Sequence, residues 1–315
     1  MSAAVEADGV RKSYGELVAV EDLTFSVEPG QILGVLGPNG AGKTTAIRVL
    51  TTLFAPSRGT FAVAGVPHTR PVEIRRRIGV LPESAGYPER QTGQEFIRYH
   101  ARLHGHARAS AVAVADRLLA EVGLADRRRE LIAGYSRGMR LRLGIARALV
   151  NEPRVVFLDE PTLGLDPAGQ RLVLSLVRRI ARERAATVLL STHLLAEVEE
   201  VCSRVLILNR GRVAAAGTVA EVARRAAAPR SARLRVAPER VEEALAVLAR
   251  APGVQHLVRA DGVPGSLTAT LDDRTSNGLM NEGLRLLVET GVPVLSFELE
   301  GARLSDAFLA MTETG

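Results

Sequence analysis

Short apolar runs alternate with stretches of helical periodicity along the first two thirds of the chain. The clearest run is Ile32–Leu36, which is followed by a glycine-rich turn and by an apolar helical segment ending near Leu53. Val155–Leu158 and Thr187–Leu190 are two further apolar runs, and polar residues follow each of them directly. Apolar runs of this length predict buried strands, so the pattern indicates an α/β fold.

Other segments complete this predicted domain. Turn-separated strands are expected at Val10–Tyr14, Val18–Val20 and Leu23–Val27, before the central strand, and at Thr60–Val63 and Gly79–Leu81 after it. Residues from about 90 to 150 are mostly helical in pattern. A helix with one apolar face follows the strand at 155–158, and its apolar positions are Val173, Leu176, Val177 and Ile180.

The last third of the chain has its own pattern. Residues 226–229, Ala-Ala-Ala-Pro, are typical of a linker. Beyond them, strand and helix patterns follow in the order βαββαβ, which predicts a small α+β domain of the ferredoxin-like kind. We therefore expect a first domain at 1–228 and an accessory domain at 229–315, and the latter contains no recognisable catalytic set. The terminal segment places Leu304, Ala307, Phe308 and Met311 on one helical face, which we expect to dock on apolar surface.

Composition agrees with a globular chain. Of the 315 residues, 46% are hydrophobic and 24% are charged. No apolar run approaches the roughly 20 residues needed to cross a bilayer, and the first residues lack the character of a signal peptide. The single cysteine, Cys202, cannot form an internal disulfide, which agrees with a reducing cytosol.

The net charge of +6 comes from 41 basic and 35 acidic residues. A basic stripe can bind nucleic acid, but only 3% of the residues are aromatic and no stacking platform is visible. Solvated helix faces or nearby anionic lipid headgroups explain the charge equally well. No nucleic-acid partner is therefore expected.

The turn after the central strand carries the first candidate chemistry. Residues 37–45 fit the pattern G-x-x-x-x-G-K-[ST] between a strand and a helix. Glycines allow backbone N–H groups to wrap a phosphate chain, and the helix begins with its positive dipole end at the phosphates. Lys43 is expected to reach the β- and γ-phosphates and Thr44 to offer its hydroxyl to Mg²⁺.

The polar residues that follow the other two buried strands complete a phosphate-cleaving set. Asp159 ends an apolar strand, where an acid holds Mg²⁺ in P-loop proteins, and Glu160 is placed to orient or deprotonate an attacking water. His193 follows the strand at 187–190. Because ligands of parallel sheets bind at the carboxyl ends of the strands, His193 is a candidate for the same site.

Three weaker signals have competing interpretations. Tyr14 can stack on an adenine ring or be an ordinary strand aromatic, and by itself the second interpretation is favoured. Ser136 suits the N-cap of a helix whose start is a second potential anion site. His100 and His104 have a spacing that can hold a metal, but no further ligand completes the shell, so solvated histidines are the favoured interpretation.

Taken together, these motifs over residues 5–225 resemble the nucleotide-binding subunit of an ATP-binding cassette (ABC) transporter. The loop at 37–45 is similar to the Walker A motif and 155–160 to Walker B with its catalytic glutamate, Glu160. The resemblance also assigns the adenine-stacking position to Tyr14, the signature sequence to 136–139, the D-loop to 164–166 and the switch histidine to His193. The nucleotide-binding residues that it implies are Tyr14, Gly37, Asn39, Gly40, Ala41, Gly42, Lys43, Thr44, Thr45, Glu83, Ser136, Gly138 and Asp166.

Two positions depart from the family pattern. Glu83 stands where the family usually has a glutamine, and its carboxylate could still reach Mg²⁺, together with Thr44 and Asp159. The signature, usually Ser-Gly-Gly-Gln, has an arginine at 137 and a methionine at 139. Both departures, and the closing segment 304–309, are similar to the branch that serves ABC-2-type exporters of the multidrug or antibiotic-resistance kind.

The resemblance implies an ATPase that binds ATP and Mg²⁺ in a head-to-tail dimer with a second copy of itself. Each ATP would lie between the Walker motifs of one subunit and Ser136 and Gly138 of the other. The dimer would power a separate membrane permease from the cytoplasmic face of the cell membrane, exporting a drug-like or other hydrophobic substrate. The alternative is a soluble ABC ATPase that acts on ribosomes or nucleic acid, although such proteins usually carry two cassettes or a long coiled coil, and this chain has one cassette and no heptad run.

Overall fold

The computed structural model describes residues 3–225, 231–251, 254–260, 263–271, 277–300 and 304–312. The chain divides into two compact units, residues 1–219 and 220–314. The linker expected at 226–229 lies outside the described residues. Among the residues that are described, no helix is both long and apolar enough to cross a bilayer.

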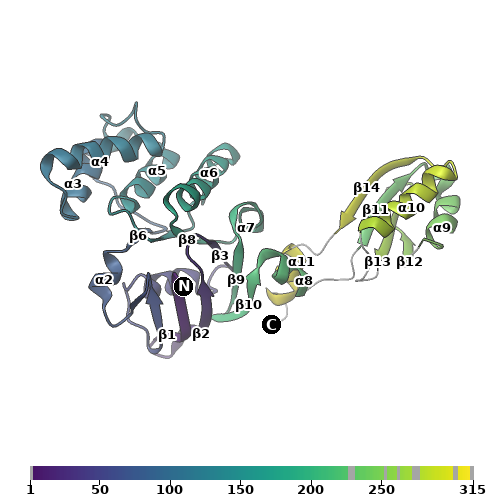
Figure 1. Cartoon of the computed structure of the whole chain (residues 1–315), viewed down its shortest axis with the longest axis horizontal. Helices are drawn as coiled ribbons and strands as arrows, with labels where there is room; N and C mark the ends of the chain where they lie inside the picture. The colour runs from purple at the N-terminus through teal and green to yellow at the C-terminus, as the bar shows by residue number, and fades with distance from the viewer. Residues whose placement is uncertain are drawn as a thin grey trace. The chain divides into compact units, whose positions relative to one another are not determined.

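The first unit is built around one mixed sheet with the strand order β5-β4-β1-β2-β10-β9-β3-β8-β7-β6 (Figure 1). Five neighbouring strands, from β9 to β6, are parallel, and the strands β5, β4, β1 and β2 form an antiparallel part. The strands are β1 Val5–Tyr14, β2 Leu17–Val27, β3 Ile32–Leu36, β4 Arg58–Val63, β5 Val66–Pro67, β6 Ile78–Leu81, β7 Val155–Asp159, β8 Thr187–Thr192, β9 Arg204–Asn209 and β10 Arg212–Thr218.

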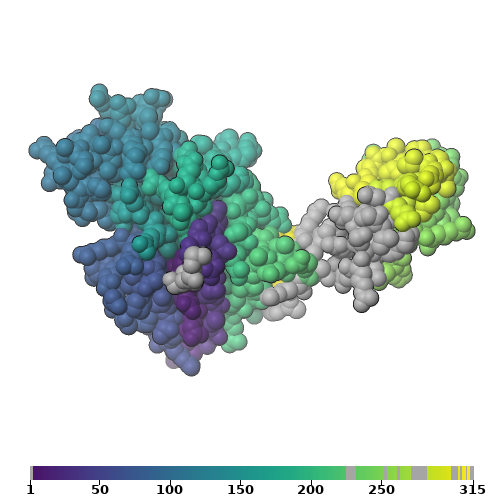
Figure 2. Space-filling view, viewed as in Figure 1, coloured from purple at the N-terminus to yellow at the C-terminus, as the bar shows by residue number. Residues whose placement is uncertain are grey.

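Helices cover the parallel part of the sheet. Figure 1 shows α3, α4 and α5 gathered beside β6, and in Figure 2 the same residues, blue to teal, form a lobe of the surface. This lobe corresponds to the helical segment expected at about 90–150. The helices of this unit are α1 Lys43–Leu50, α2 Pro71–Arg75, α3 Gly93–Leu103, α4 Arg108–Glu121, α5 Arg137–Ala148, α6 Pro167–Arg184 and α7 Leu195–Val201, with a short 3₁₀ turn at Ile132–Gly134.

The parallel strands are buried on both faces, which explains their unbroken apolar sequence. In β7, Val156 and Leu158 pack into one core with the helical lobe and α6. Val155 and Phe157 point to the opposite face and pack into a second core with α1 and the antiparallel strands. The carboxyl ends of these strands consequently form a rigid edge, and the polar residues beyond each run are placed there.

The second unit contains a four-stranded antiparallel sheet in the order β12-β13-β11-β14. Along the chain its elements follow as β11-α9-β12-β13-α10-β14, the order expected from the sequence. Leu234 and Leu267 are both fully buried in its core. In α11, Leu304 and Ala307 are buried, as expected for one apolar face. The elements are α8 Val219–Arg225, β11 Ser231–Val236, α9 Val241–Leu248, β12 Val254–Arg259, β13 Ser266–Leu271, α10 Asn277–Glu289, β14 Val294–Glu300 and α11 Leu304–Thr312, with a 3₁₀ turn at Pro238–Arg240.

Candidate functional site

The glycine-rich loop between β3 and α1 needs glycine for steric reasons. Gly42 is the N-cap of α1 and has a left-handed φ of 101°, which glycine adopts without strain. A Cβ on Gly37 would lie 2.4 Å from the carbonyl oxygen of Leu208, so no larger residue fits without a backbone shift. These two positions fix a tight loop whose amides and whose helix start form a phosphate-binding geometry.

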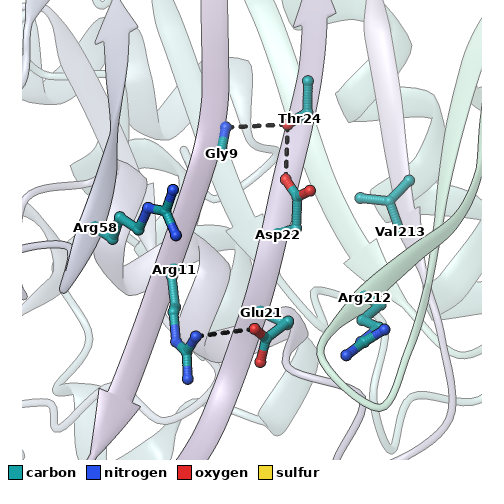
Figure 3. Close-up of a pocket in the computed structure, with 8 residues that line it drawn as sticks. All are labelled: Gly9, Arg11, Glu21, Asp22, Thr24, Arg58, Arg212 and Val213. Carbon is teal, nitrogen blue, oxygen red and sulfur yellow. Dashed lines mark hydrogen bonds and ion pairs between the residues drawn. The ribbon is translucent and has the colours of Figure 1, made fainter.

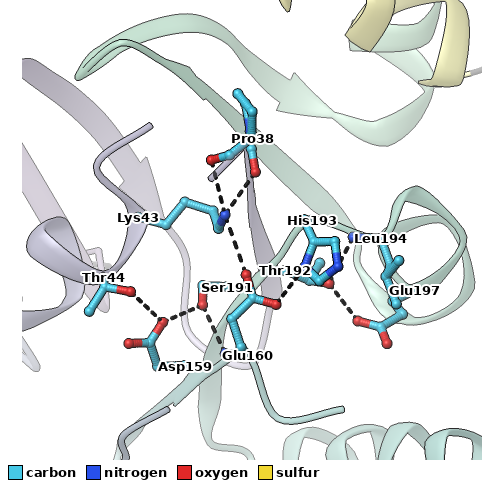
Figure 4. A network of polar contacts seen from close by, with 11 residues as sticks. Pro38, Lys43, Thr44, Asp159, Glu160, Ser191, Thr192, His193, Leu194 and Glu197 are labelled. Atoms are coloured by element: carbon cyan, nitrogen blue, oxygen red, sulfur yellow. Dashed lines mark hydrogen bonds and ion pairs between the residues drawn. The ribbon is translucent and has the colours of Figure 1, made fainter. Parts of the chain in front are cut away.

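Lys43 is held beneath this loop, at the start of α1 (Figure 4). Its Nζ donates to the carbonyl oxygens of Gly37 at 2.8 Å and Pro38 at 3.3 Å. The same nitrogen lies 3.3 Å from Oε1 of Glu160, and both side chains are more than nine-tenths buried. A buried cation at the loop is therefore in direct contact with the carboxylate expected to act on water.

Asp159 occupies the end of β7, beside Ser191 in the register of the neighbouring strand β8. Its Oδ1 accepts from the Ser191 hydroxyl at 2.6 Å and from the Thr44 hydroxyl at 3.3 Å. Burial raises the pKa of Asp159, the bonds from Ser191 and Thr44 lower it, and the charges of Glu83 and Glu160 raise it further. A divalent cation would relieve this cost, and carboxylate and hydroxyl oxygens are ligands that Mg²⁺ accepts.

Glu160 follows directly and adopts a left-handed backbone with φ of 48°. Its N–H donates to both the carbonyl and the hydroxyl oxygen of Ser191, which holds this turn in place. Its Oε2 lies 2.9 Å from Nδ1 of His193, while Oε1 contacts Lys43 (Figure 4). A carboxylate held by two positively polarised partners is well placed to accept a proton from a water molecule.

A cavity of about 490 Å³ lies over these residues. It brings together Glu83, from the loop after β6, with Glu160 and His193. Its lining also includes Leu17, Val18, Ala19, Leu163 and the loop and helix residues Asn39, Gly40, Ala41, Gly42, Lys43, Thr44 and Thr45. Most of the Walker A loop, Glu160 of Walker B, Glu83 and the switch histidine thus share one hollow, whereas Asp159 and Gly37 lie outside its lining.

Tyr14 lies at the end of β1 and does not belong to that lining. Its ring is 41% exposed, packs edge-to-face on Phe54 at 5.9 Å between ring centroids, and lies 5.2 Å from the Lys12 ammonium. Leu17, three residues further on and also exposed, lines the cavity in its place. A role for Tyr14 in adenine stacking therefore stays a prediction.

The remaining expected nucleotide residues are also outside this lining. Ser136 is the N-cap of α5 and accepts from the N–H of Met139 at 3.3 Å, as its position suggested. Asp166 is the N-cap of α6 and accepts from the N–H of Gly169 at 3.1 Å. Both side chains are exposed, as is required of groups that would act on a second copy.

Arg137, one of the departures from the usual signature, contacts the expected D-loop. A Cβ on Gly164 would lie 2.7 Å from the guanidinium carbon of Arg137, so the arginine packs directly on that glycine. Arg137 also lines a smaller cavity of about 310 Å³, together with Glu83, Tyr87 and Glu160. The arginine therefore joins the start of α5 to the turn before α6.

Comparison with known proteins agrees with this geometry. A family model described as ABC transporter matches residues 20–163. The daunorubicin/doxorubicin resistance ATP-binding protein of Streptomyces peucetius is 39% identical, and the alignment covers 98% of this chain and 92% of that protein. This chain belongs to the ABC transporter family.

Further relatives support the ATP-binding branch of this family. The bacitracin transport ATP-binding protein of Bacillus licheniformis is 38% identical, over 68% of this chain and 69% of its own length. A solved ATP-binding subunit of an ABC transporter superposes with a TM-score of 0.63 at 33% identity, covering 70% of this chain and 92% of that one. The ABC cassette fold and the ABC ATPase assignment expected from the sequence are confirmed.

Within this ABC ATPase, His100 of the helical lobe differs from the expectation. His100 is half-buried rather than fully solvated. It packs on Phe96 with 4.7 Å between ring centroids, and burial, Arg147 and His104 lower its pKa to about 4. His104 is largely exposed, as expected, and its partial burial and the charge of His106 lower its pKa. No cluster of metal-binding side chains occurs in the part of the chain that the structure describes. Phe96 lies one helical turn before His100, so the sequence could have predicted that the two rings pack on each other.

A separate hollow of about 520 Å³ lies on the antiparallel part of the sheet (Figure 3). A row of charged residues crosses it, in which Arg58 is paired with Arg11 in the register of β4 and β1. Arg11 is bound to Glu21 at 3.0 Å, and Arg212 is paired in register with Asp22. Arg58 and Arg11 thus lie on one side of the acids Glu21 and Asp22, and Arg212 lies on the other. None of these residues belongs to the cavity at Lys43.

The structure adds three residues to which sequence reasoning gave no role. Ser191 bridges Asp159 and Glu160, and Thr192 donates to the buried Glu197 at 2.7 Å (Figure 4). Ser191 and Thr192 could have been inferred from the sequence, because they are polar residues at the end of an apolar parallel strand. Glu197 lies within a helical pattern beside other glutamates, so the sequence did not distinguish it.

Proposed function

We propose that this chain is the ATP-hydrolysing subunit of an exporter whose membrane permease is a separate polypeptide. The observation that carries the proposal is the arrangement of Lys43, Asp159 and Glu160 around one phosphate-binding loop. The names of relatives that act in doxorubicin resistance and bacitracin transport support a drug-like or other hydrophobic substrate.

The residues present fit ATP with Mg²⁺. The Gly37 position has no room for a Cβ, so the backbone can approach the phosphates closely, and Lys43 would hold the β- and γ-phosphates. Thr44, Asp159 and Glu83 would hold Mg²⁺. When bound, Mg²⁺ neutralises charge on the phosphates. Burial is the largest cause of the raised pKa of Asp159, and a bound divalent cation would offset it by stabilising the ionised carboxylate.

Hydrolysis forms a bond between a water oxygen and the γ-phosphorus and breaks the bond from that phosphorus to the β-phosphate oxygen. Glu160 would orient the attacking water and accept its proton on the carboxylate. His193 holds Oε2 of this carboxylate at 2.9 Å, and Lys43 holds Oε1. These two contacts fix the carboxylate plane, so one geometry of the proton acceptor is favoured.

We also propose a second copy of this chain as a partner. Ser136 and Asp166 are exposed caps outside the lining at Lys43, and Gly138 lies beside Ser136 on α5. Their exposure supports a site in which Ser136 and Gly138 of one copy close over the ATP bound by the other. Tyr14 would then stack on adenine after Leu17 or Phe54 adjusts.

The remaining parts of the proposal concern location and domains. With its permease, the chain would act at the cytoplasmic face of the cell membrane. Residues 1–228 would form the cassette, and residues 229–315 a ferredoxin-like accessory domain that modulates the assembly without chemistry. The strand order β12-β13-β11-β14 supports this description of the second unit.

Nucleotide binding by the purified full-length chain tests the site. Lys43→Ala should weaken Mg-ATP binding at least about tenfold. The variant loses a charged contact to phosphate worth about 1.4 kcal/mol or more, and about 1.4 kcal/mol of binding free energy corresponds to a tenfold change in affinity. Arg70→Ala, which removes an exposed charge paired with Glu73, is the matched control and should bind normally. Equal affinity of the Lys43→Ala and wild-type proteins would refute the assignment. Coupling to transport is tested by adding the separate permease that the proposal requires, which should change the ATPase rate.

A further inference from the structure

Glu197 is a buried carboxylate to which the proposed hydrolysis gives no role. It lies on α7, is 4% exposed, and is followed by the buried Val198. Its Oε2 accepts from the Thr192 hydroxyl at 2.7 Å, whereas Oε1 is buried without a hydrogen-bond partner among the described residues. Burying a half-satisfied carboxylate costs stability, so its presence requires an explanation.

The hydroxyl of Thr192 connects Glu197 to the switch histidine. Because this hydroxyl donates its proton to Glu197, its lone pairs remain free, and one of them accepts from the N–H of Leu194 at 3.0 Å. Residue 193 lies between the two partners of that bond. The backbone on both sides of His193 is thereby fixed in one conformation.

His193 in turn contacts the proposed proton acceptor. Its Nδ1 lies 2.9 Å from Oε2 of Glu160, and its side chain is 36% exposed, so packing alone does not determine where the ring points. Figure 4 shows the contact of Glu197 with Thr192 and the contact of His193 with Glu160, and Thr192 and His193 are consecutive in the chain. A change in the 192–194 turn would move the ring relative to the carboxylate.

We infer that Glu197 is a positioning residue, which sets the turn of His193 through the Thr192 hydroxyl and so holds Glu160 for reaction. This inference rests on the proposed function. A purely structural role is a poorer explanation, because Val198 and Val201 already anchor α7 by apolar burial. An apolar residue of similar volume at 197 would pack there without burying a charge.

The test compares Glu197→Leu with Glu197→Gln in the full-length protein. Leu removes the acceptor, and Gln keeps an amide oxygen that can accept from Thr192. We expect Glu197→Leu to keep or raise the Tm, to lower kcat at least about tenfold, and to leave KM for ATP within about twofold, since misplacement of a reacting group by about 1 Å costs up to about 10²-fold. Glu197→Gln should recover most of kcat.

Two threonines at opposite ends of β8 provide matched variants. Thr192→Val should lower kcat as Glu197→Leu does, and the double variant should be no slower than either single one, because both act through one hydroxyl. Thr187→Val, the control, removes a buried hydroxyl that binds the Gly30 N–H at 3.0 Å and should lower Tm without lowering kcat.

Opposite results would overturn the inference. A folded Glu197→Leu protein with wild-type kcat would make Glu197 a structural residue only, whether or not its Tm is lower. Multiplicative losses in the double variant would show that Glu197 does not act through Thr192. Either result leaves the proposed function intact, because that proposal is tested separately by ATP binding in Lys43→Ala and by hydrolysis in Glu160→Gln.

Discussion

Ser191→Ala removes the hydroxyl that joins the two neighbouring acids. Ser191 is fully buried, its Oγ donates to Asp159 at 2.6 Å, and it accepts from the N–H of Glu160 at 3.0 Å. The Glu160 N–H retains its bond to the Ser191 carbonyl oxygen, so the main loss is the bond to the Asp159 carboxylate. Hydrogen bonds to charged groups contribute about 1.5–3 kcal/mol. For a domain of this size we therefore expect Tm to fall by roughly 3–12 °C.

The fall in Tm caused by Ser191→Ala should depend on pH. Burial already raises the pKa of Asp159, and the bond from Ser191 is the strongest influence that lowers it, so the variant should raise this pKa further. A carboxylate whose folded-state pKa is raised loses stability as pH rises through that pKa. The deficit in Tm should consequently be larger at pH 8 than at pH 5. The acid limb of the Mg²⁺-dependent ATPase profile should also move to higher pH, because Mg²⁺ requires ionised Asp159.

Scanning calorimetry at the two pH values and a steady-state pH profile measure both effects. Ser175→Ala is the control, since its exposed hydroxyl donates to the Leu172 carbonyl oxygen at 2.7 Å, away from any acid. A Tm deficit equal at pH 5 and pH 8, together with an unmoved acid limb, would refute the assignment of Ser191 as the group that stabilises ionised Asp159.

Three further predictions concern other parts of the chain. Glu83→Gln should keep much of the ATPase activity, because glutamine can also ligate Mg²⁺. Glu83→Ala should reduce coupling to the permease more than it reduces ATP affinity. Loss of nucleotide binding in both variants would make Glu83 a primary ligand. Because the pKa of His100 is lowered to about 4, stability should be lost as pH falls from about 6.5 toward 4. His100→Phe should therefore lose less Tm between pH 7 and pH 5 than the wild-type protein does. Equal losses of Tm in the two proteins would contradict a half-buried, neutral His100 ring. A chain ending at Ala228 should bind ATP once circular dichroism shows that it is folded, and a folded but non-binding protein would contradict the two-domain proposal.

Much of the fold could be predicted because local pattern and tertiary position agree. The run Val155–Leu158 is apolar at every position because β7 is covered on both faces. The pairing of β2 with β10 could not be predicted, since only Asp22 and Arg212 define it and their sequence separation is large. The length of β1 and β2 was also underestimated, because register shifts in their pairing interrupt the simple alternation.

The site was predictable where chemistry follows a short motif. Lys43, Asp159, Glu160 and His193 were expected at one sheet edge. The structure brings Lys43 and His193 into direct contact with Glu160, and Ser191 joins Asp159 to Glu160. The ion pair between Lys43 and Glu160 was not foreseen, because no local pattern encodes a contact across 117 positions. Glu197 was missed for a related reason: its importance comes from burial and from Thr192, which the sequence does not display.

The central claim is that Glu160 accepts the proton from water in ATP hydrolysis. Single-turnover hydrolysis of Mg-ATP by Glu160→Gln tests it most directly, with Glu152→Gln, an exposed acid paired with Arg117, as the matched control. We predict that Glu160→Gln binds ATP, accumulates as an ATP-bound dimer and hydrolyses about 10²–10⁴-fold more slowly, the usual contribution of general base catalysis, while the control retains the wild-type rate. Hydrolysis by Glu160→Gln at the wild-type rate would contradict the account.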